Sequence, residues 1–150
     1  MAYNILIMHI LITGGAGFQG SHLIESLLAK KHQVTILNTP SQRASDNVAS
    51  FKNRVRIVWG SITDQELVNK TVREHEVVFH LAAYINVDES RLYPERVIQT
   101  NVLGTTYILN AVEDNNIRLI YVSSCEVYGD GHSDDGKLSE TVEMRPNNPY

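Results

Sequence analysis

The sequence holds 150 residues, of which 43% are hydrophobic, and a chain of this size buries about two-thirds of its unfolded surface in a single domain. Thirteen Lys and Arg stand against seventeen Asp and Glu, for a net charge of −4, and neither sign gathers in a stripe or tail. This pattern argues against nucleic acid as a partner. No apolar run approaches the ~20 residues that cross a bilayer, and the single cysteine, Cys125, cannot form an internal disulfide. We therefore expect a cytoplasmic protein with no membrane partner.

Strand and helix patterns alternate along the first half of the chain. The apolar run from Ile5 to Ile12 predicts a buried strand, and a glycine-rich turn follows it. The next segment has the spacing of a single helix face, with apolar residues at Phe18, Leu23, Ile24, Leu27 and Leu28. A second strand is predicted at 33–37, a loop or irregular helix at 39–50, and a third strand at 54–60.

The alternation continues in the second half. TDQE at 63–66 is typical of a capping box in which Thr63 begins a helix that runs to about His75. A fourth strand is predicted at 77–83 and a fifth at 118–124. Between them a long helix begins near Pro94, and the pattern predicts a buried face made of Val97, Ile98, Val102, Ile108, Leu109 and Val112.

Short strands that alternate with helices predict an α/β fold. Each parallel pair needs a right-handed crossover, so the expected architecture is a Rossmann-type doubly wound parallel sheet with helices on both faces. We expect the strand order 3-2-1-4-5. Ligands of such sheets bind beyond the carboxyl ends of the strands, where the winding reverses.

The turn after the first strand carries glycines at 14, 17 and 20. Gly14 allows the tight turn, Gly17 allows a pyrophosphate to approach the backbone, and Gly20 allows close packing of helix and strand. The helix that follows offers backbone amides and a positive dipole end to phosphates. Because the pattern follows a buried strand and opens an amphipathic helix, we favour a dinucleotide site over a purely structural turn.

The residue that ends the second strand bears on the choice between NAD and NADP. A carboxylate at this place grips the adenosine ribose of NAD, but the sequence has Asn38. Asparagine can still bind a ribose hydroxyl, and it does not repel a 2′-phosphate, which Arg43 lies close enough to bind. We therefore expect NAD, and NADP is not excluded.

Six motifs, in order, resemble the extended short-chain dehydrogenases/reductases, specifically the NAD-dependent nucleotide-sugar epimerases and 4,6-dehydratases. They are TGGAGFQGSHL, GSITD, HLAA, VDES…P…TNVLGT, YVSSCEVYGD and the closing NNPY. The resemblance implies a nucleotide-sugar substrate and a cofactor that is reduced and reoxidised within one turnover. It also implies further cofactor contacts at Phe18, Gln19, Ser61, Ile62, Leu81, Ala82, Ala83, Asn101 and Val122. Gln19 and Ser61 depart from the residues usual in the family.

The same resemblance places the family's catalytic tyrosine at Tyr150, which would take the proton from the sugar 4-hydroxyl. A phenol holds its proton tightly at neutral pH, and in the family a lysine four residues later assists it. Residues 1–150 therefore read as the dinucleotide-binding domain, truncated before that lysine and before the C-terminal substrate domain. Ser124 matches the serine or threonine that hydrogen-bonds the reacting 4-oxygen. His80 is interpreted as a packed strand residue and not as an acid or base.

The residue type at Glu126 distinguishes the 4,6-dehydratases from the 4-epimerases of the family that the sequence resembles. Dehydratases and related decarboxylases commonly have glutamate there, able to remove the C5 proton, whereas 4-epimerases usually have small or uncharged residues. Cys125 takes the place of an aspartate or serine, and a thiol is a poor proton donor to a leaving hydroxyl. We interpret Cys125 as a residue of the catalytic segment that fills space, and Glu126 as a base, with a plain surface carboxylate as the other interpretation.

Three functions therefore stay open. The first is a nucleotide-sugar 4,6-dehydratase, the second is a 4-epimerase such as a UDP-glucose 4-epimerase, and the third is a non-catalytic NAD-binding fragment. The resemblance implies a homodimer for the full-length form. The histidines show no metal-ligand spacing, so no metal is expected.

Overall fold

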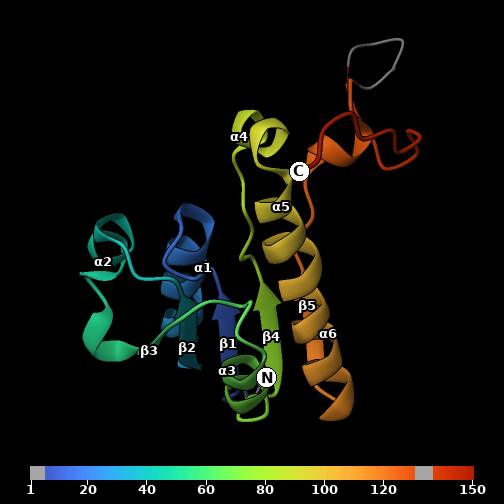
Figure 1. Ribbon diagram of the computed structural model, residues 1–150. Helices are drawn as coiled ribbons and strands as arrows, with labels where there is room; N and C mark the ends of the chain where they lie inside the picture. The colour runs from blue at the N-terminus through green and yellow to red at the C-terminus, as the bar shows by residue number, and fades with distance from the viewer. Residues whose placement is uncertain (1–5, 131–136) are drawn as a thin grey trace.

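A five-stranded parallel sheet forms the centre of the molecule, and the computed structural model describes residues 6–130 and 137–150 (Figure 1). The strands lie in the order β3-β2-β1-β4-β5, and every pair is parallel. Their bounds are β1 His9–Thr13, β2 Gln33–Asn38, β3 Arg56–Trp59, β4 Val77–His80 and β5 Arg118–Tyr121. This order confirms the doubly wound sheet predicted from the sequence, with the winding reversing between β1 and β4.

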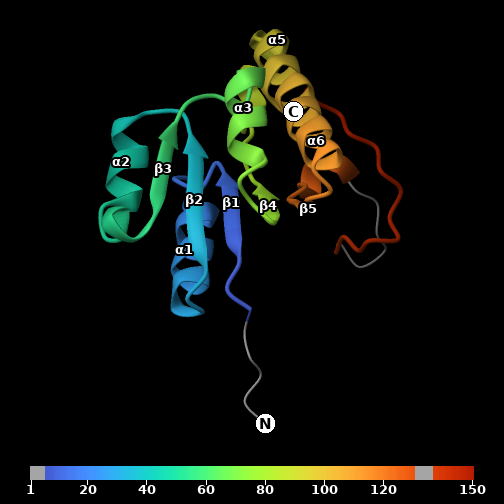
Figure 2. The same ribbon diagram turned by 90° about the horizontal axis from the view of Figure 1, so that it is seen from below.

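Helices make the crossovers between the strands. In chain order they are α1 Phe18–Ala29, α2 Gln42–Val48, the 3-10 helix η1 Lys52–Arg54, α3 Gln65–Val72, α4 Val87–Leu92, α5 Pro94–Val97, the π-helix η2 Ile98–Gly104, α6 Thr105–Asp114 and the 3-10 helix η3 Cys125–Tyr128. The run from α5 through η2 to α6 crosses from β4 to β5, and Figure 2 shows α3 lying near this run. Both α4 and η3 were absent from the sequence-based prediction.

Two hydrophobic cores lie on opposite faces of the sheet. Because side chains alternate along a strand, Ile10 and Ile12 of β1 pack against α1 and α2, while Leu11 packs against α3 and α6. All three are essentially inaccessible to solvent. A strand buried on both faces explains why the sequence of β1 reads as a continuous apolar run and not as an alternating one.

Several predicted strands were too long at one or both ends. The first strand begins at His9, and Leu6 and Ile7 before it are exposed. The fourth strand ends at His80 and the fifth at Tyr121, each three residues earlier than predicted. The excess residues, 81–83 and 122–124, leave the ladder at the carboxyl edge, where ligand sites of this fold form.

The predicted buried face of the long helix was partly wrong. Val97, Ile108 and Val112 are buried as expected, but the exposed fractions of Ile98, Val102 and Leu109 are 59%, 58% and 47%. Ile98 and Leu109 each come directly after a buried residue, so they lie about 100° further round the helix and outside its buried face. The predicted buried face was therefore too wide.

The start of α3 also differs from the predicted capping box. Asp64, not Thr63, is the N-cap, and its carboxylate accepts a 3.0 Å hydrogen bond from the amide of Leu67. The Thr63 hydroxyl instead lies 2.8 Å from the Ser61 hydroxyl. The helix ends at Val72, three residues before the predicted end.

Candidate active site

A cleft of about 890 Å³ lies at the carboxyl edge of the sheet, where the glycine turn meets the ends of β2, β3 and β4 and the segment after β5. Most residues predicted to form the site line this one cleft, although they are far apart in the sequence. They are Gly14, Gly17, Phe18, Gln19, Gly20, Asn38, Ser61, Ile62, Leu81, Ala82, Ala83, Ser124, Cys125 and Tyr150. Three others, Asn101, Val122 and Glu126, are not among the lining residues.

The glycine turn has a shape that other residues would not allow. Gly14 has φ = +70°, and a Cβ at this position would lie 2.7 Å from the backbone nitrogen of Ala82. A Cβ on Gly20 would lie 2.6 Å from the Cα of Gly15. Helix α1 begins after Gly17 without a side-chain cap, so the first-turn amides of this 12-residue helix stay available to an anion.

The end of β2 is joined to the glycine turn through Ala16. The Asn38 amide oxygen accepts a 3.2 Å hydrogen bond from the Ala16 amide, and the Asn38 amide nitrogen donates to the Thr39 carbonyl at 2.8 Å. Asn47 of α2 donates to the Ala16 carbonyl, also at 2.8 Å. Asn47 lines the cleft as well, and sequence reasoning missed it because no local motif marks an asparagine late in a short helix.

The segment after β3 lines the cleft with a polar residue, Ser61, and an apolar residue, Ile62. The Ser61 hydroxyl accepts a 3.1 Å hydrogen bond from the Thr63 amide in a local turn. Ile62 is buried, and a Cβ on Gly104 would lie 2.7 Å from its side chain. A side chain at Gly104 would therefore displace Ile62 where the helical run crosses this corner, a role that its place in TNVLGT did not reveal.

His80 ends β4 in a buried hydrogen-bonded chain. Its Nδ1 lies 2.6 Å from the Thr13 hydroxyl and its Nε2 lies 2.9 Å from the Thr105 hydroxyl. Thr13 also accepts a hydrogen bond from the Ala82 amide at 3.2 Å. Burial lowers the pKa of His80 to about 4, so the ring is neutral at pH 7. Its position behind the cleft agrees with the packed residue expected from the sequence.

Asn101 acts on the cleft through Tyr84. Its side chain accepts from the Tyr84 amide at 2.7 Å and donates to the Tyr84 carbonyl at 3.1 Å, which fixes the backbone after β4. Tyr84 lines the cleft, and its hydroxyl donates to Glu89, an interaction that raises the pKa of the phenol. Sequence reasoning missed Tyr84, although its place directly after HLAA at a strand end was a usable signal. Val122 continues the pairing of β5 with β4, because its amide donates to the His80 carbonyl at 3.1 Å.

The segment after β5 and the last residues of the described chain form one unit above the cleft. Ser124 caps η3, accepting a 3.3 Å hydrogen bond from the Glu126 amide. The half-buried Glu126 carboxylate accepts a 2.8 Å hydrogen bond from Asn148. Gly129 has φ = +61°, and a Cβ there would lie 2.0 Å from the Arg145 carbonyl oxygen. These contacts hold the final residues against η3, and Tyr150 reaches the same cleft as Ser124.

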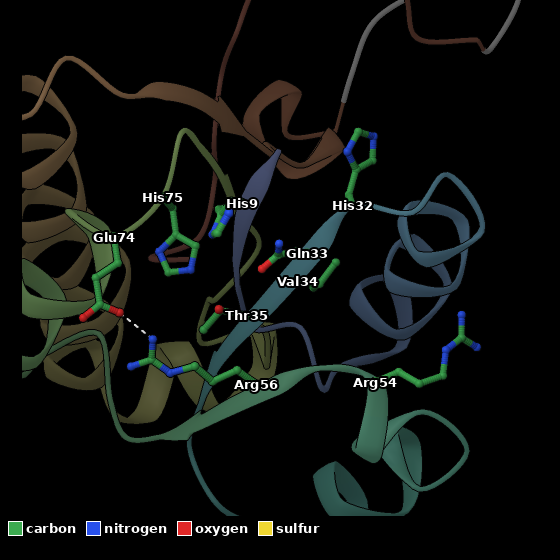
Figure 3. A pocket seen from close by; sticks show the side chains of 9 residues that line it. All are labelled: His9, His32, Gln33, Val34, Thr35, Arg54, Arg56, Glu74 and His75. Carbon is green, nitrogen blue, oxygen red and sulfur yellow. Dashed lines mark hydrogen bonds and ion pairs between the residues drawn. The ribbon is translucent and has the colours of Figure 1, made fainter. Parts of the chain in front are cut away.

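A second, smaller hollow of about 390 Å³ lies at the opposite, amino edge of the sheet (Figure 3). Arg56 and Glu74 form an ion pair across it, and the Arg56 guanidinium lowers the pKa of Glu74. His75 is buried, is within 2.8 Å of the Thr71 carbonyl through Nδ1, and has a pKa lowered by burial. None of the residues predicted for the site lines this hollow.

The described residues hold neither a candidate metal site nor a candidate membrane span. Within residues 6–130 and 137–150, no three His, Cys, Asp or Glu side chains lie together in a way that could hold a metal ion. No helix of these ranges is long and apolar enough to cross a membrane.

The fold and the cleft together define a Rossmann-type α/β domain with a cleft at the carboxyl edge of its sheet. The sequence model of the GDP-mannose 4,6-dehydratase family matches residues 11–150. The chain belongs to this family, and the predicted resemblance to the NAD-dependent epimerases and dehydratases of the extended short-chain dehydrogenase/reductase class is confirmed.

Known proteins similar to this chain include both dehydratases and epimerases. A dTDP-glucose 4,6-dehydratase of Mycolicibacterium smegmatis is 40% identical over 147 residues, which cover 95% of this chain and 44% of the relative. The structure of DesIV, a dTDP-glucose 4,6-dehydratase of Streptomyces venezuelae with NAD bound, superposes with a TM-score of 0.83 at 35% identity, covering 95% of this chain and 47% of the other. A UDP-glucose 4-epimerase of Stenotrophomonas maltophila with NAD bound gives 0.83 at 29% identity, with coverages of 95% and 44%. The chain thus spans less than half the length of these proteins.

Proposed function

We propose that this chain is the cofactor-binding and catalytic part of an NAD-dependent nucleotide-sugar 4,6-dehydratase. The observation that carries the proposal is the meeting of Ser124, Cys125 and Tyr150 with the glycine turn in one cleft, with Glu126 on the adjoining 3-10 helix. The dehydratase relative and the dehydratase structure described above support this choice of chemistry.

The residues present fit a dinucleotide. The uncapped start of α1 and the close approach allowed by Gly14 and Gly17 suit a pyrophosphate. Asn38 and Ser61 would face the adenosine half, while the Leu81–Ala83 segment would face the nicotinamide half. When bound, NAD supplies the acceptor and later the donor of the hydride that leaves C4 of the sugar.

Tyr150 and Ser124 would act on the sugar 4-oxygen. The Tyr150 phenolate would accept the 4-hydroxyl proton, and the Ser124 hydroxyl would donate a hydrogen bond to the same oxygen and hold it in place. Both side chains line the cleft from separate parts of the chain. Since Asn148 anchors the final residues to Glu126 at 2.8 Å, the position of the tyrosine depends on that anchor.

Glu126 would act as the base, and then as the acid, in the elimination of water. Its carboxylate would remove the C5 proton that a 4-ketone makes acidic, and the C6 hydroxyl would leave as water after it receives a proton. A thiol is a poor proton donor to a leaving hydroxyl, so we assign the return of that proton to the protonated Glu126. We assign Cys125 to filling the wall of the cleft.

A 4-epimerase is the second candidate, and a specific observation favours it. The Glu126 side chain is not among the residues that line the cleft, and its carboxylate is bound to Asn148. If the carboxylate keeps this partner in the enzyme, only the tyrosine and serine face the sugar, which is enough for oxidation and re-reduction at C4.

The test is a product analysis with the full-length protein. Nucleotide-hexoses with GDP, dTDP and UDP would be incubated with the enzyme and the products identified by NMR and mass spectrometry. A 4-keto-6-deoxy sugar, lost in Glu126→Gln but not in a Glu113→Gln control, supports the dehydratase. Interconversion of the C4 epimers without a keto product contradicts it and supports the epimerase. The homodimer and the cytoplasmic location stay predictions, to be tested by light scattering and cell fractionation.

A further inference from the structure

Two consecutive asparagines bind the acids of the segment around η3. Asn147 donates a 2.8 Å hydrogen bond to the Asp130 carboxylate, and Asn148 donates a bond of the same length to Oε2 of Glu126. The first pair is exposed, whereas both members of the second pair are half-buried. The second contact is therefore the one shielded from water, and it involves the carboxylate proposed as the base.

The Asn148 amide uses its nitrogen fully and its oxygen not at all. The nitrogen donates to Glu126 and, at 3.2 Å, to the side-chain oxygen of Asn147. Within residues 6–130 and 137–150, the oxygen Oδ1 is the only buried side-chain nitrogen or oxygen atom without a hydrogen-bond partner. A buried acceptor without a donor is unfavourable, and each such atom in a folded protein needs a reason.

Glu126 changes its hydrogen-bonding needs during the proposed elimination. As a base it is a carboxylate, which only accepts hydrogen bonds, and after it takes the C5 proton it is a carboxylic acid with one O–H donor. An amide offers both kinds of group. Asn148 can therefore bind the carboxylate through Nδ2 and the carboxylic acid through Oδ1, and the second role gives the unpartnered oxygen its function.

The other charged groups of the same two segments are bound elsewhere. Asp130 is held by Asn147, and the Arg145 guanidinium donates to the Glu143 carboxylate at 2.6 Å. The neutral amide of Asn148 is thus the side chain that the structure places on the Glu126 carboxylate.

We propose that Asn148 is a positioning residue for Glu126, which orients the carboxylate for removal of the C5 proton and then stabilises the acid that this step forms. This role rests on the proposed dehydratase function and deepens it by naming the residue that prepares the base. It is the opposite of what the epimerase candidate requires, because there the same contact withholds the carboxylate from the sugar. The bond from Asn148 uses Oε2 alone, so Oε1 is the oxygen assigned to proton transfer.

The proton taken from C5 is the one that leaves in the water. The C5–H bond breaks as an O–H bond forms on Glu126, and the electron pair left at C5 is delocalised onto the 4-ketone. The proton then passes to the C6 hydroxyl, the C6–O bond breaks, and a C5–C6 double bond forms as the carboxylate is restored. Asn148 donates to Glu126 before the first transfer and accepts from it between the two.

The experiment separates proton removal at C5 from oxidation at C4. The full-length enzyme is given dTDP-glucose, GDP-mannose and UDP-glucose in heavy water, and entry of deuterium at C5 and formation of the 4-keto-6-deoxy product are followed by NMR. Oxidation at C4 is followed by the transient absorbance of reduced nicotinamide. Asn148→Leu should slow C5 exchange by about tenfold more than C4 oxidation, the scale of one hydrogen bond to a charged group.

Matched variants distinguish positioning from a merely structural role. Asn147→Leu removes the neighbouring contact with Asp130 and should leave the ratio of the two rates unchanged. Asn148→Gln keeps an amide and should recover part of the C5 exchange lost in Asn148→Leu. Asn148→Asp places a second acid beside Glu126, and such a pair shares a proton until the pH is high enough to ionise both. Its C5 exchange should therefore rise with pH where that of the original enzyme is flat.

The outcomes distinguish the two proposals. If the original enzyme forms no 4-keto-6-deoxy product from any of the three sugars, the dehydratase function and the role of Asn148 are both overturned. If the product forms but Asn148→Leu slows C4 oxidation and C5 exchange equally, Asn148 only anchors the segment that carries Tyr150, and its positioning of Glu126 is wrong while the dehydratase stands. A ratio of rates in Asn148→Leu equal to that in Asn147→Leu leads to the same conclusion.

Discussion

The two edges of the sheet each carry a hollow, and they differ in how far their polar groups are already occupied. At the amino edge, Arg56 and Glu74 neutralise each other, and His75 is buried and bonded to its own helix. At the carboxyl edge, the start of α1 lacks a cap, and Arg43 has no acid beside it in the lining. A ligand site is recognised by polar groups that the fold leaves available, and not by a hollow alone.

The largest expected effect comes from removing the hydroxyl of Tyr150. Tyr150→Phe should lower kcat by about 10²- to 10⁴-fold, the usual scale for loss of an acid–base group. The measurement is turnover of the nucleotide-sugar, with cofactor affinity determined in parallel. Tyr121→Phe, an exposed tyrosine on β5, is the matched control. A Tyr150 variant with more than half the original kcat would remove this residue from the reaction.

The next effect concerns the glycine turn. Gly14→Ala should lower the free energy of unfolding by about 2 to 4 kcal/mol, from a left-handed φ and the 2.7 Å approach of its Cβ to Ala82. Gly17 has φ = −77°, so Gly17→Ala should destabilise the fold less. Urea denaturation measures both variants. Equal losses would show that the turn can relax and that the conformation of Gly14 is not required.

A smaller effect is expected from pH, through His80. Its folded pKa of about 4 lies below the usual 6.5, so protonation favours the unfolded chain. Stability is present above pH 6.5 and is lost as the pH falls from 6.5 toward 4, by about 2 kcal/mol between pH 7 and pH 5.

His80→Gln, which keeps hydrogen-bonding groups for Thr13 and Thr105, should flatten this dependence in urea melts at several pH values. The exposed His22→Gln should not. A His80→Gln slope equal to that of the original protein would place the titration elsewhere.

The smallest change in the free energy of unfolding is predicted for the ion pair at the amino edge of the sheet. Arg56→Gln should change the free energy of unfolding by less than about 1 kcal/mol, because both partners of its ion pair are partly exposed. Binding of 5′-ADP should be unaffected. A clear loss of nucleotide binding in Arg56→Gln would contradict the contrast between the two edges.

Much of the fold could be predicted from local patterns. The strand order and the glycine turn followed from alternation, motif spacing and the rule that places ligands at the carboxyl edge, and most of the other predicted lining residues followed from the resemblance to the family. The errors came where tertiary contacts override local preference. Ile98 and Val102 of η2 are exposed although the pattern assigned them to the buried face, and Asp64 caps α3 in place of Thr63.

The type of sheet and the place of the glycine turn follow from short-range regularities in the sequence: the spacing of apolar residues and the conformational freedom of glycine at 14. The family follows from the six motifs that carry the resemblance. The contacts of Asn38 with Ala16, of Asn101 with Tyr84 and of Asn148 with Glu126 are seen only in the folded structure. Each of these contacts joins residues at least 17 positions apart. Their partners are chosen by the packing of strands and helices, which no local pattern records.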